Sequence, residues 1–453
     1  MTRTTKTTTA SNTPKNIPTV PEAEWPYQVP ENWQWVYWGE IGDFISGNGF
    51  KNEYQGFTNY DIPFYKVGSL KYSDSNGYIY DNTNTISNEI RIILKASLIP
   101  TSSILFAKIG EAIRLNRRSI NNIPCCIDNN MMAFVSKNCI VKYVYFWSCG
   151  LNLYDYTNAT TVPAIRKTDL EKIPFPLPPL AEQQRIVDRI ERLFAKLDEA
   201  REKAQAVVDG FENRKAAILH QAFTGELTKK WREERGIGMD TWERLPLSKL
   251  SDKIFDGPFG SNLKTEDYVD SGIRVVRLEN IKNLWFDDSK QSFVTKEKYK
   301  TIENHTLYPT DLIMATFISD EIKICQMPSY IGFAINKSDC VGIRLKDSIN
   351  HCYVLFYLSS KDVYNNLLKS IHGATRPRVN TKQIKSIQIP TSSLNEQTII
   401  IQEIEKLLSQ ERRARDLAES VIAQIDGMKK AILARAFRGE LGTNVPGEVP
   451  CEG

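Results

Sequence analysis

Two long segments of the chain carry apolar residues at alternating steps of four and three, which is the spacing of one face of an α-helix. In the first segment these residues are Ile186, Ile190, Leu193, Leu197, Ala200, Ala204, Val207, Phe211, Ile218 and Ala222. In the second they are Ile400, Ile404, Leu407, Ala414, Ala418, Val421, Ile425, Met428, Ile432 and Ala436. A stripe held over several heptads is typical of a coiled-coil seam, so we expect two long helices that pair with each other.

The two helical segments are copies of one another. Leu180–Leu227 and Leu394–Leu441 align without a gap, and 20 of the 48 positions are identical. In both copies a glutamate, Glu182 or Glu396, falls in the first helical turn, where the helix dipole favours an anion. A glycine, Gly225 or Gly439, stands where a left-handed C-terminal cap belongs. The chain is therefore two half-proteins in tandem, and we expect the helices to pair antiparallel.

A region of short β-rich runs precedes each helix. Ile62–Val67 matches Ile273–Leu278, Ser103–Ala107 matches Asp311–Ala315, and the exits Ala159–Pro163 and Gly373–Pro377 also correspond. The prolines of Pro174–Pro179 are expected to end the first region, because proline cannot continue a strand or helix interior. The β-rich regions diverge far more than the helices do, which suggests that each half recognises something different.

These patterns predict an α+β protein with a pseudo-two-fold internal repeat. Two β-rich α/β domains would be separated by two long helices that form an antiparallel coiled coil. The expected parts are a disordered tail over 1–24, a first domain over 25–175, a first helical spacer over 176–228, a linker over 229–240, a second domain over 241–389, a second helical spacer over 390–442 and a disordered tail over 443–453.

Composition narrows the possible chemistry. The 58 Lys and Arg against 54 Asp and Glu give a formal charge of +4, which neither requires nor excludes nucleic acid. The eight cysteines form no CxxC pair, so we expect no metal site and reduced thiols. We find no signal pattern, no membrane-spanning run and no phosphate-binding Gly-x-x-x-x-Gly-Lys loop. We therefore expect a cytoplasmic protein without catalytic residues of its own.

The repeated helix motif resembles the conserved region of type I restriction–modification specificity subunits. Both copies, Pro176–Leu227 and Pro390–Leu441, carry Pro-x-x-x-Leu-x-Glu-Gln before the helix and Lys-x-Ala-Ile-Leu-x-x-Ala-Phe-x-Gly-Glu-Leu at its end, and Val29–Gly42 has the family's tryptophan-rich opening. The resemblance implies two target-recognition domains, each recognising one half of an asymmetric, interrupted DNA site. It also implies partners: two methyltransferase subunits that modify adenine N6, and restriction subunits that cleave DNA. S-adenosylmethionine, ATP and Mg²⁺ would be used by those partners and no cofactor by this chain.

Basic and polar residues of the β-rich regions are the candidate DNA contacts, because such side chains pair with phosphate or with base edges. The candidates are Lys66, Lys108, Arg114, Arg117, Arg118, Thr160, Arg166, Lys264, Arg274, Arg277, Thr316, Lys323, Thr375, Arg376 and Arg378. Two runs, Arg114–Arg118 and His372–Arg378, place cations beside small turn-forming residues, where backbone can approach phosphate closely. The tryptophans Trp33, Trp35, Trp38 and Trp242 are expected to pack in the core or at a domain edge.

Two other functions remain open from the residues alone. Asp311, Glu321 and Lys323 have the loose spacing of a metal-dependent nuclease set, which would make the chain an autonomous nuclease. Alternatively, the coiled coil could make it a structural adaptor that recognises no DNA sequence.

The helices are further expected to dock partners and to set a distance. Ile218, Phe223, Ile432 and Phe437 belong to apolar runs wider than the seam, and we expect them to contact methyltransferase subunits. A stiff helix pair would hold two DNA-recognising domains about one duplex turn, roughly 34 Å, apart. Four residues inserted after Thr228 would then lengthen the unread spacer of the DNA site by one or two base pairs.

Overall fold

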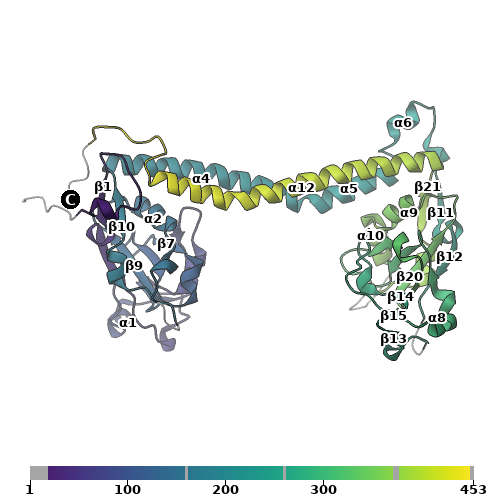
Figure 1. The fold of residues 1–453 in the computed structure, drawn as a ribbon, viewed down its shortest axis with the longest axis horizontal. Coiled ribbons are helices and arrows are strands. Elements are labelled where there is room, and N and C mark those ends of the chain that lie inside the picture. Colours follow the sequence, from purple (N-terminus) through teal and green to yellow (C-terminus); the bar gives the residue numbers. More distant parts are fainter. Residues whose placement is uncertain (1–18, 159–161, 259–261, 371–376, 449–453) are drawn as a thin grey trace, which may run out of the picture. The chain divides into compact units, whose positions relative to one another are not determined.

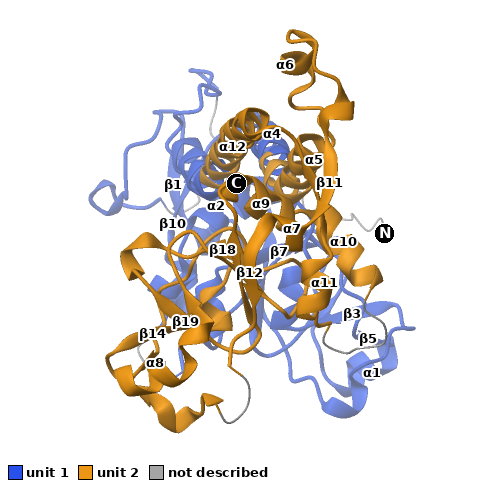
Figure 2. Cartoon of the chain, turned by 90° about the vertical axis from the view of Figure 1, so that its right-hand side faces the viewer, with its two compact units in different colours: residues 1–203, 421–453 blue, residues 204–420 orange. Residues whose placement is uncertain are grey.

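The computed structural model describes residues 19–158, 162–258, 262–370 and 377–448. The chain forms two compact units, which do not coincide with its two sequence halves (Figure 2). Unit 1 combines residues 1–203 with residues 421–453, and unit 2 consists of residues 204–420. Each unit thus contains one β-rich domain together with parts of both helical repeats.

The helical repeats fold as α4 (Leu180–Asp209) with α5 (Phe211–Phe223), and as α12 (Leu394–Ala436) (Figure 1). The predicted glycine caps are confirmed: Gly225 and Gly439 have φ values of +85° and +74°. The amide of the residue after each glycine donates to a carbonyl five residues earlier, which is the hydrogen bond of a Schellman cap. Because α5 ends at Phe223, an insertion after Thr228 lies beyond the helix and cannot lengthen it, which corrects that design.

Within each unit the helices run antiparallel, as predicted. In unit 1, Asp198 of α4 pairs with Lys429 of α12 at 2.5 Å, and Arg201 pairs with Asp426. In unit 2, Arg214 of α5 pairs with Glu411 at 2.6 Å. In unit 1, a residue further along α4 therefore pairs with a residue further back along α12, as expected for antiparallel helices.

The positions of the predicted seam on α12 are partly wrong. The predicted positions Ala418 and Ile425 are buried, but Ala414, Val421 and Met428 are exposed, and the buried Leu408 was not part of the predicted seam. Two cations occupy seam positions: the Arg415 guanidinium lies 4.7 Å from the centre of the Phe211 ring, and Lys429 lies 5.0 Å from that of Phe194. Long basic side chains cover aromatic rings with their aliphatic stems, so a polar residue can occupy a position that an apolar pattern does not reveal.

A break at Gly210 separates α4 from α5. Arg214 Nη2 donates to Val207 O at 2.7 Å, and a Cβ on Gly210 would lie only 2.3 Å from Arg214 Nη1. Glycine thus leaves room for the Arg214 guanidinium where this side chain crosses the helix. The second repeat has Gln424 at this position, and α12 continues through it.

The β-rich domain of unit 1 has a five-stranded sheet ordered β2-β9-β6-β7-β4, a three-stranded sheet ordered β5-β3-β8 and a β1-β10 pair. Its strands are β1 (Gln34–Tyr37), β2 (Gly42–Ser46), β3 (Ile62–Tyr65), β4 (Tyr78–Ile79), β5 (Thr85–Ile86), β6 (Ile104–Ala107), β7 (Arg118–Asn121), β8 (Cys126–Ile127), β9 (Met131–Ser136) and β10 (Pro174–Leu177). Its helices are α1 (Asn88–Ile93), α2 (Val141–Gly150) and α3 (Lys167–Glu171). The proline-rich exit is thus partly a strand, contrary to expectation, and it pairs only with β1 at an edge that tolerates proline.

The β-rich domain of unit 2 repeats this plan with a four-stranded sheet ordered β12-β20-β17-β18, a five-stranded sheet ordered β13-β15-β14-β19-β16 and a β11-β21 pair. Its strands are β11 (Glu243–Pro246), β12 (Ser251–Phe255), β13 (Tyr268–Val269), β14 (Ile273–Val276), β15 (Phe293–Val294), β16 (Thr306–Leu307), β17 (Leu312–Ala315), β18 (Ile324–Gln326), β19 (Ala334–Asn336), β20 (Cys340–Leu345) and β21 (Gln388–Thr391). Its helices are α6 (Lys229–Glu233), α7 (Leu247–Leu250), α8 (Lys296–Ile302), α9 (His351–Leu358), α10 (Lys361–Lys369) and α11 (Thr381–Lys385).

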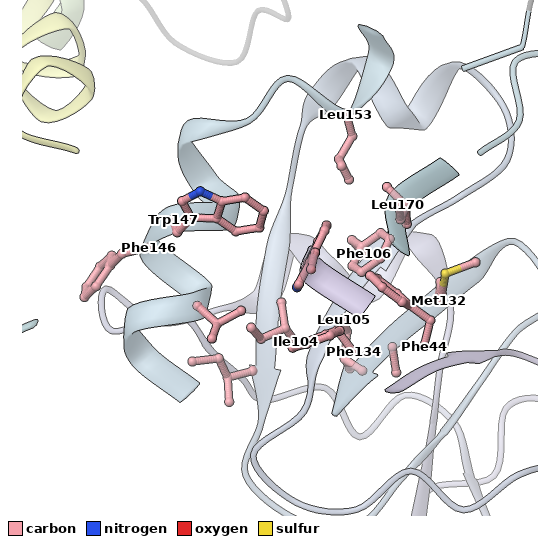
Figure 3. Close-up of a cluster of buried hydrophobic side chains, with 14 of the residues drawn as sticks. Phe44, Ile104, Leu105, Phe106, Met132, Phe134, Phe146, Trp147, Leu153 and Leu170 are labelled. Carbon is pink, nitrogen blue, oxygen red and sulfur yellow. The ribbon is translucent and has the colours of Figure 1, made fainter. Parts of the chain in front are cut away.

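The core of unit 1 is an aromatic cluster between the main sheet and α2 (Figure 3). Trp38, which is fully buried, meets Phe44 and Trp147 edge to face, with ring centres 4.8 and 4.9 Å apart. Trp33 and Trp35 are buried as well. The expectation that the tryptophans of this half pack in the core is therefore confirmed.

The two phenylalanines predicted to dock partner subunits are buried instead. Phe437 is 4% exposed, and its ring packs edge-on against Tyr143 of α2 in unit 1. Phe223 is also 4% exposed and packs against Tyr353 and Tyr357 of α9 in unit 2. Because each side chain fills the core of the domain beside its helix end, the docking prediction is wrong for both. Their neighbours Ile218 and Ile432 are half-buried against the same cores.

In unit 2, Glu396 and Gln397 at the start of α12 connect this helix with residues 228–242 and with the start of α9. Glu396 is 1% exposed and accepts hydrogen bonds from Thr228 Oγ1 at 2.7 Å, Arg232 Nη1 at 2.8 Å and Trp242 Nε1 at 3.0 Å. Next to it, Gln397 Oε1 accepts from the amide of Asn350, which caps α9, at 2.9 Å. We call the contacts of Glu396 with residues 228–242 the second clasp.

Unit 1 has a corresponding first clasp, made by the C-terminal segment. Glu182 is fully buried, and its carboxylate accepts from Thr443 Oγ1 at 2.7 Å. Arg185 bonds both Glu182, at 2.9 Å, and Glu448, at 2.6 Å. At the other end of the described chain, Val20 is 3% exposed and donates to Trp35 O. The expectation of disorder is therefore wrong for residues 19–24 and 443–448, while residues 1–18 and 449–453 lie outside the described part.

Among the described residues, no helix is both long enough and apolar enough to cross a membrane.

Candidate nucleic-acid interface

The two domains share one framework of backbone hydrogen bonds. It forms where the exit segment meets the residues that follow β6 in unit 1 and β17 in unit 2. In unit 1 the exit segment pairs with the end of β6: Gly110 N donates to Pro163 O at 2.8 Å and Ile165 N to Lys108 O at 2.9 Å. In unit 2 the same ladder joins Ile318 N to Pro377 O at 3.0 Å and Val379 N to Thr316 O at 2.9 Å. The predicted correspondence of these segments is thereby confirmed for their described residues.

In unit 1, this framework brings two candidate lysines to one carboxylate. Lys66 follows β3, Lys108 follows β6, and Asp128 follows β8. Burial raises the pKa of the Asp128 carboxyl, and the hydrogen bond from Asn130 N together with the charges of both lysines opposes that shift. Burial also lowers the pKa of the Lys108 ammonium. Lysine side chains of this kind are among the groups that contact phosphates and base edges in protein–DNA interfaces, so Lys66 and Lys108 stay candidates.

In unit 2, the corresponding positions carry different side chains. Thr316 stands where unit 1 has Lys108, and Arg378 stands where unit 1 has Ala164. The backbone of Thr316 donates to Asp339 O at 2.9 Å, as Lys108 donates to Asn130 O at 2.8 Å. One backbone frame thus presents a lysine and an amide in the first domain, but an arginine and a carboxylate in the second.

Three of the predicted DNA contacts are interior residues, and the prediction is wrong for them. Arg118 of β7 is 5% exposed and donates to the carbonyls of Asn116 and Leu151. Arg274 of β14 is 6% exposed and is paired with Asp288 at 2.5 Å. Thr316 is 1% exposed and donates to Asp339 Oδ1. Successive strand residues face opposite sides, so a basic residue can point inward when a carboxylate or carbonyl awaits it.

The other candidates divide by accessibility. Arg114 is exposed, stacks on the Tyr154 ring at 3.7 Å and pairs with Glu111 at 2.6 Å. Arg277 and Lys323 are half-buried. The exposed candidates that stay predictions are Arg114, Arg117, Arg166, Lys264 and Arg378. Thr160, Thr375 and Arg376 lie outside the described residues.

Sequence reasoning selected cations and missed the acidic residues that hold them. Asp128 follows β8 of the three-stranded sheet and Asp339 lies between β19 and β20, both in connections where turn residues are common, so their positions alone did not distinguish them from ordinary turns. Matching the two halves does not single them out either, because Asn130 stands in unit 1 where unit 2 has Asp339.

The proposed nuclease set does not form a site. Arg344 binds both oxygens of Asp311 at 2.7 and 3.0 Å, and the amide of Tyr308 also donates to this carboxylate. Glu321 is exposed, on the loop before β18. Within the described ranges, no group of three or more His, Cys, Asp or Glu side chains could hold a metal ion. Asp311 thus serves as the partner of a structural arginine.

Comparison with known proteins places the chain. The sequence model of the type I restriction modification DNA specificity domain matches residues 30–207 and again residues 240–417. The chain belongs to this family. Both copies of the specificity domain include most of a β-rich domain and the first part of the long helix that follows it.

Relatives of the specificity domains extend over most of the chain. The type I restriction enzyme EcoDI specificity subunit of Escherichia coli is 22% identical over 93% of this chain and 92% of its own length. The MjaVIII specificity subunit of Methanocaldococcus jannaschii is 22% identical over 91% of this chain and 94% of its own length. The EcoBI specificity subunit of Escherichia coli is 23% identical over 65% of this chain, a match that spans 64% of that relative.

Two solved structures share the fold. The HsdS subunit from Thermoanaerobacter tengcongensis covers 92% of this chain and 99% of its own length, with a TM-score of 0.61 and 17% identity. A chain from a study of complex assembly and conformational transition of the type I R-M system gives a TM-score of 0.63 at 16% identity, covering 92% of this chain and 100% of its own. The predicted fold class and family are therefore confirmed, and the nuclease and adaptor alternatives have no support.

Proposed function

We propose that this specificity subunit is itself non-catalytic and recognises an asymmetric, bipartite DNA site, with each β-rich domain binding one half-site. The observation that carries the proposal is the shared framework with exchanged side chains. The same ladder of backbone bonds presents Lys108 beside Asn130 in unit 1 and Arg378 beside Asp339 in unit 2. A conserved frame with different donors and acceptors is what two different half-sites require, because base identity is read through hydrogen-bonding groups at base edges.

We further propose the partners of the assembled enzyme. Two methyltransferase subunits would methylate adenine N6 with S-adenosylmethionine, and restriction subunits would use ATP and Mg²⁺ to cleave DNA, while this chain would bind no cofactor. The names of the relatives, which are subunits of type I restriction enzymes, support this division of labour. The helical repeats would dock the methyltransferase subunits through surfaces other than the buried Phe223 and Phe437.

Exchange of the first domain tests modular recognition. Replacing residues 25–175 by the equivalent region of a relative is expected to change one half of the methylated motif and leave the other half unchanged. The grafted domain should keep an aromatic residue at Tyr143, because Phe437 packs against that ring. Mapping of N6-methyladenine in cells that co-express the modification subunits provides the measurement. A motif altered in both halves, or in neither, would contradict modular recognition.

A second test concerns the helices as the part that sets the unread spacer. Seven residues inserted into α4 after Arg201 and seven into α12 after Asp426 add one heptad to each helix at facing positions. The helical rise makes this about 10 Å, so we expect the unread spacer to lengthen by two or three base pairs, with both half-sites unchanged. A matched insertion after Thr228, beyond the end of α5, is expected to leave the spacer as it was. An unchanged spacer in the helix variant would sink the proposal that the helices set this distance.

A further inference from the structure

Arg378 lies at an open hollow on the surface of unit 2. The hollow measures about 570 Å³ and is lined by residues that include Asp256, Thr316, Arg378, Asn380 and Lys382. Arg378 lies in the exit segment, between Pro377 and Val379, whose backbone groups form the ladder with the residues that follow β17. Its side chain is 46% exposed, so the guanidinium lies at the surface of the domain.

Two side chains fix the orientation of this guanidinium. Asp339 accepts a hydrogen bond from Arg378 Nη2, and the Phe317 ring lies under the guanidinium with its centre 5.4 Å away. Asp339 is itself held, since Thr316 donates to its side chain and to its carbonyl. The bond to Asp339 uses one of the five N–H donors of the arginine, so donors remain for a ligand.

The charges around Arg378 disfavour phosphate as that ligand. Asp256 and Asp339 both lie close to the guanidinium, and burial together with the nearby Asp339 charge raises the pKa of the Asp256 carboxyl, with hydrogen bonds and Arg378 opposing. Two carboxylates balance the charges of Arg378 and Lys382 and leave the hollow without net positive charge, whereas a phosphate contact gains its energy from an excess of positive charge. A neutral acceptor, such as the O6 and N7 edge of guanine, remains favourable because it requires aligned donors and no net charge.

Unit 1 has no such arrangement at the matching place. There Ala164 replaces Arg378, Asn130 replaces Asp339, and Ile109 replaces Phe317. The arginine, its carboxylate and its aromatic support therefore occur together only in the second domain, among the described residues of these two frames. A feature confined to one half suits a contact that distinguishes one half-site from the other.

We infer that Arg378 recognises a guanine in the half-site bound by the second domain, with Asp339 and Phe317 as the residues that position its guanidinium. The inference rests on the proposed function and adds the base and the residue that reads it. A bidentate arginine–guanine contact discriminates against other bases by about 1–3 kcal/mol, which corresponds to roughly 5- to 150-fold in affinity.

The test compares Arg378→Lys with the unchanged chain in the assembled modification complex. Lysine keeps the charge but loses the planar fork, so binding to unrelated DNA is expected to persist while the guanine requirement at one position relaxes. The readouts are the methylated motif in cells and the affinity for duplexes that carry each of the four bases at that position. Asp339→Asn is expected to weaken the same preference to a smaller extent without changing the melting temperature, which a merely structural role would change.

Arg235→Lys is a matched control. Arg235 lies over the Trp231 ring at 4.7 Å, pairs with Glu234 at 3.7 Å and is 48% exposed, but it belongs to the connector after α5. Its replacement is expected to leave the motif intact. An unchanged motif in Arg378→Lys would overturn the inference, as would an equal loss of affinity for all sequences with a shallower salt dependence, which would indicate a phosphate contact. If the unchanged chain itself directs no bipartite motif, the proposed function fails instead.

Discussion

Replacing Phe437 by alanine is expected to lower the free energy of unfolding of unit 1 by about 3–5 kcal/mol, the usual cost of removing a buried aromatic ring. Phe437 directly follows α12, yet its ring packs against Tyr143, 5.2 Å away between ring centres, in the core of the first domain. The destabilisation should therefore affect a domain whose contact residue, Tyr143, lies almost three hundred positions before Phe437 in the sequence. Urea denaturation measures the total effect.

Hydrogen exchange locates the effect of this substitution. Amides of the main sheet of unit 1 should lose protection while those of unit 2 keep it. Phe223→Ala should give the opposite pattern, because Phe223 packs against Tyr353 in unit 2. Leu417→Ala is the control on α12, the helix that ends directly before Phe437: the Leu417 side chain is 69% exposed, so a change within about 0.5 kcal/mol is expected. Loss of protection in the second domain on Phe437→Ala would show that the assignment of helix ends to units is wrong.

The second large effect is expected at the second clasp. Arg232→Ala leaves the Glu396 carboxylate buried without the cation that now lies 2.8 Å away, and an uncompensated buried charge costs about 3–5 kcal/mol. Thermal unfolding of unit 2 measures the loss. The double variant Arg232→Met with Glu396→Gln removes both charges together and should recover much of the stability. If the single and double variants lose equally, the ion pair contributes through packing alone.

The helical repeats were predictable because helices obey local rules. Gly225 and Gly439 marked the helix ends, and the apolar repeat located both helices and their antiparallel partnership. The exact positions of the seam were harder to predict. Arg415 and Lys429 fill part of it with their aliphatic stems, and a search for apolar residues does not find them. The end of each helical repeat packs against the domain of the other sequence half, and this was not predictable either, because the contact of Phe437 with Tyr143 joins residues remote in sequence.

In the candidate interface, too, local features were predictable from the sequence and long-range contacts were not. Matching strands, and hence matching positions in both domains, followed from Ile62–Val67 and its counterpart in the second half. Whether a given arginine faces solvent depends on which side of its strand it lies and on whether another segment supplies a partner, as Asp288 does for Arg274. Asp339, which orients Arg378, is also 39 residues away from it. Side chains that act through long-range partners are therefore the part that a single sequence reveals least.

The assignment of residues 421–453 to unit 1 bears on how such a gene can be shortened. A product that ends shortly after α5 would lose the second domain and also Leu433, Ala436 and Phe437, which complete the core of the first. Two copies of such a half-length product could restore that core only if each supplied its own α5 end, with Leu219, Ala222 and Phe223 in the same repeat positions. The duplicated helix is thus what would let half a gene encode a symmetric dimer, whose DNA site would then be palindromic.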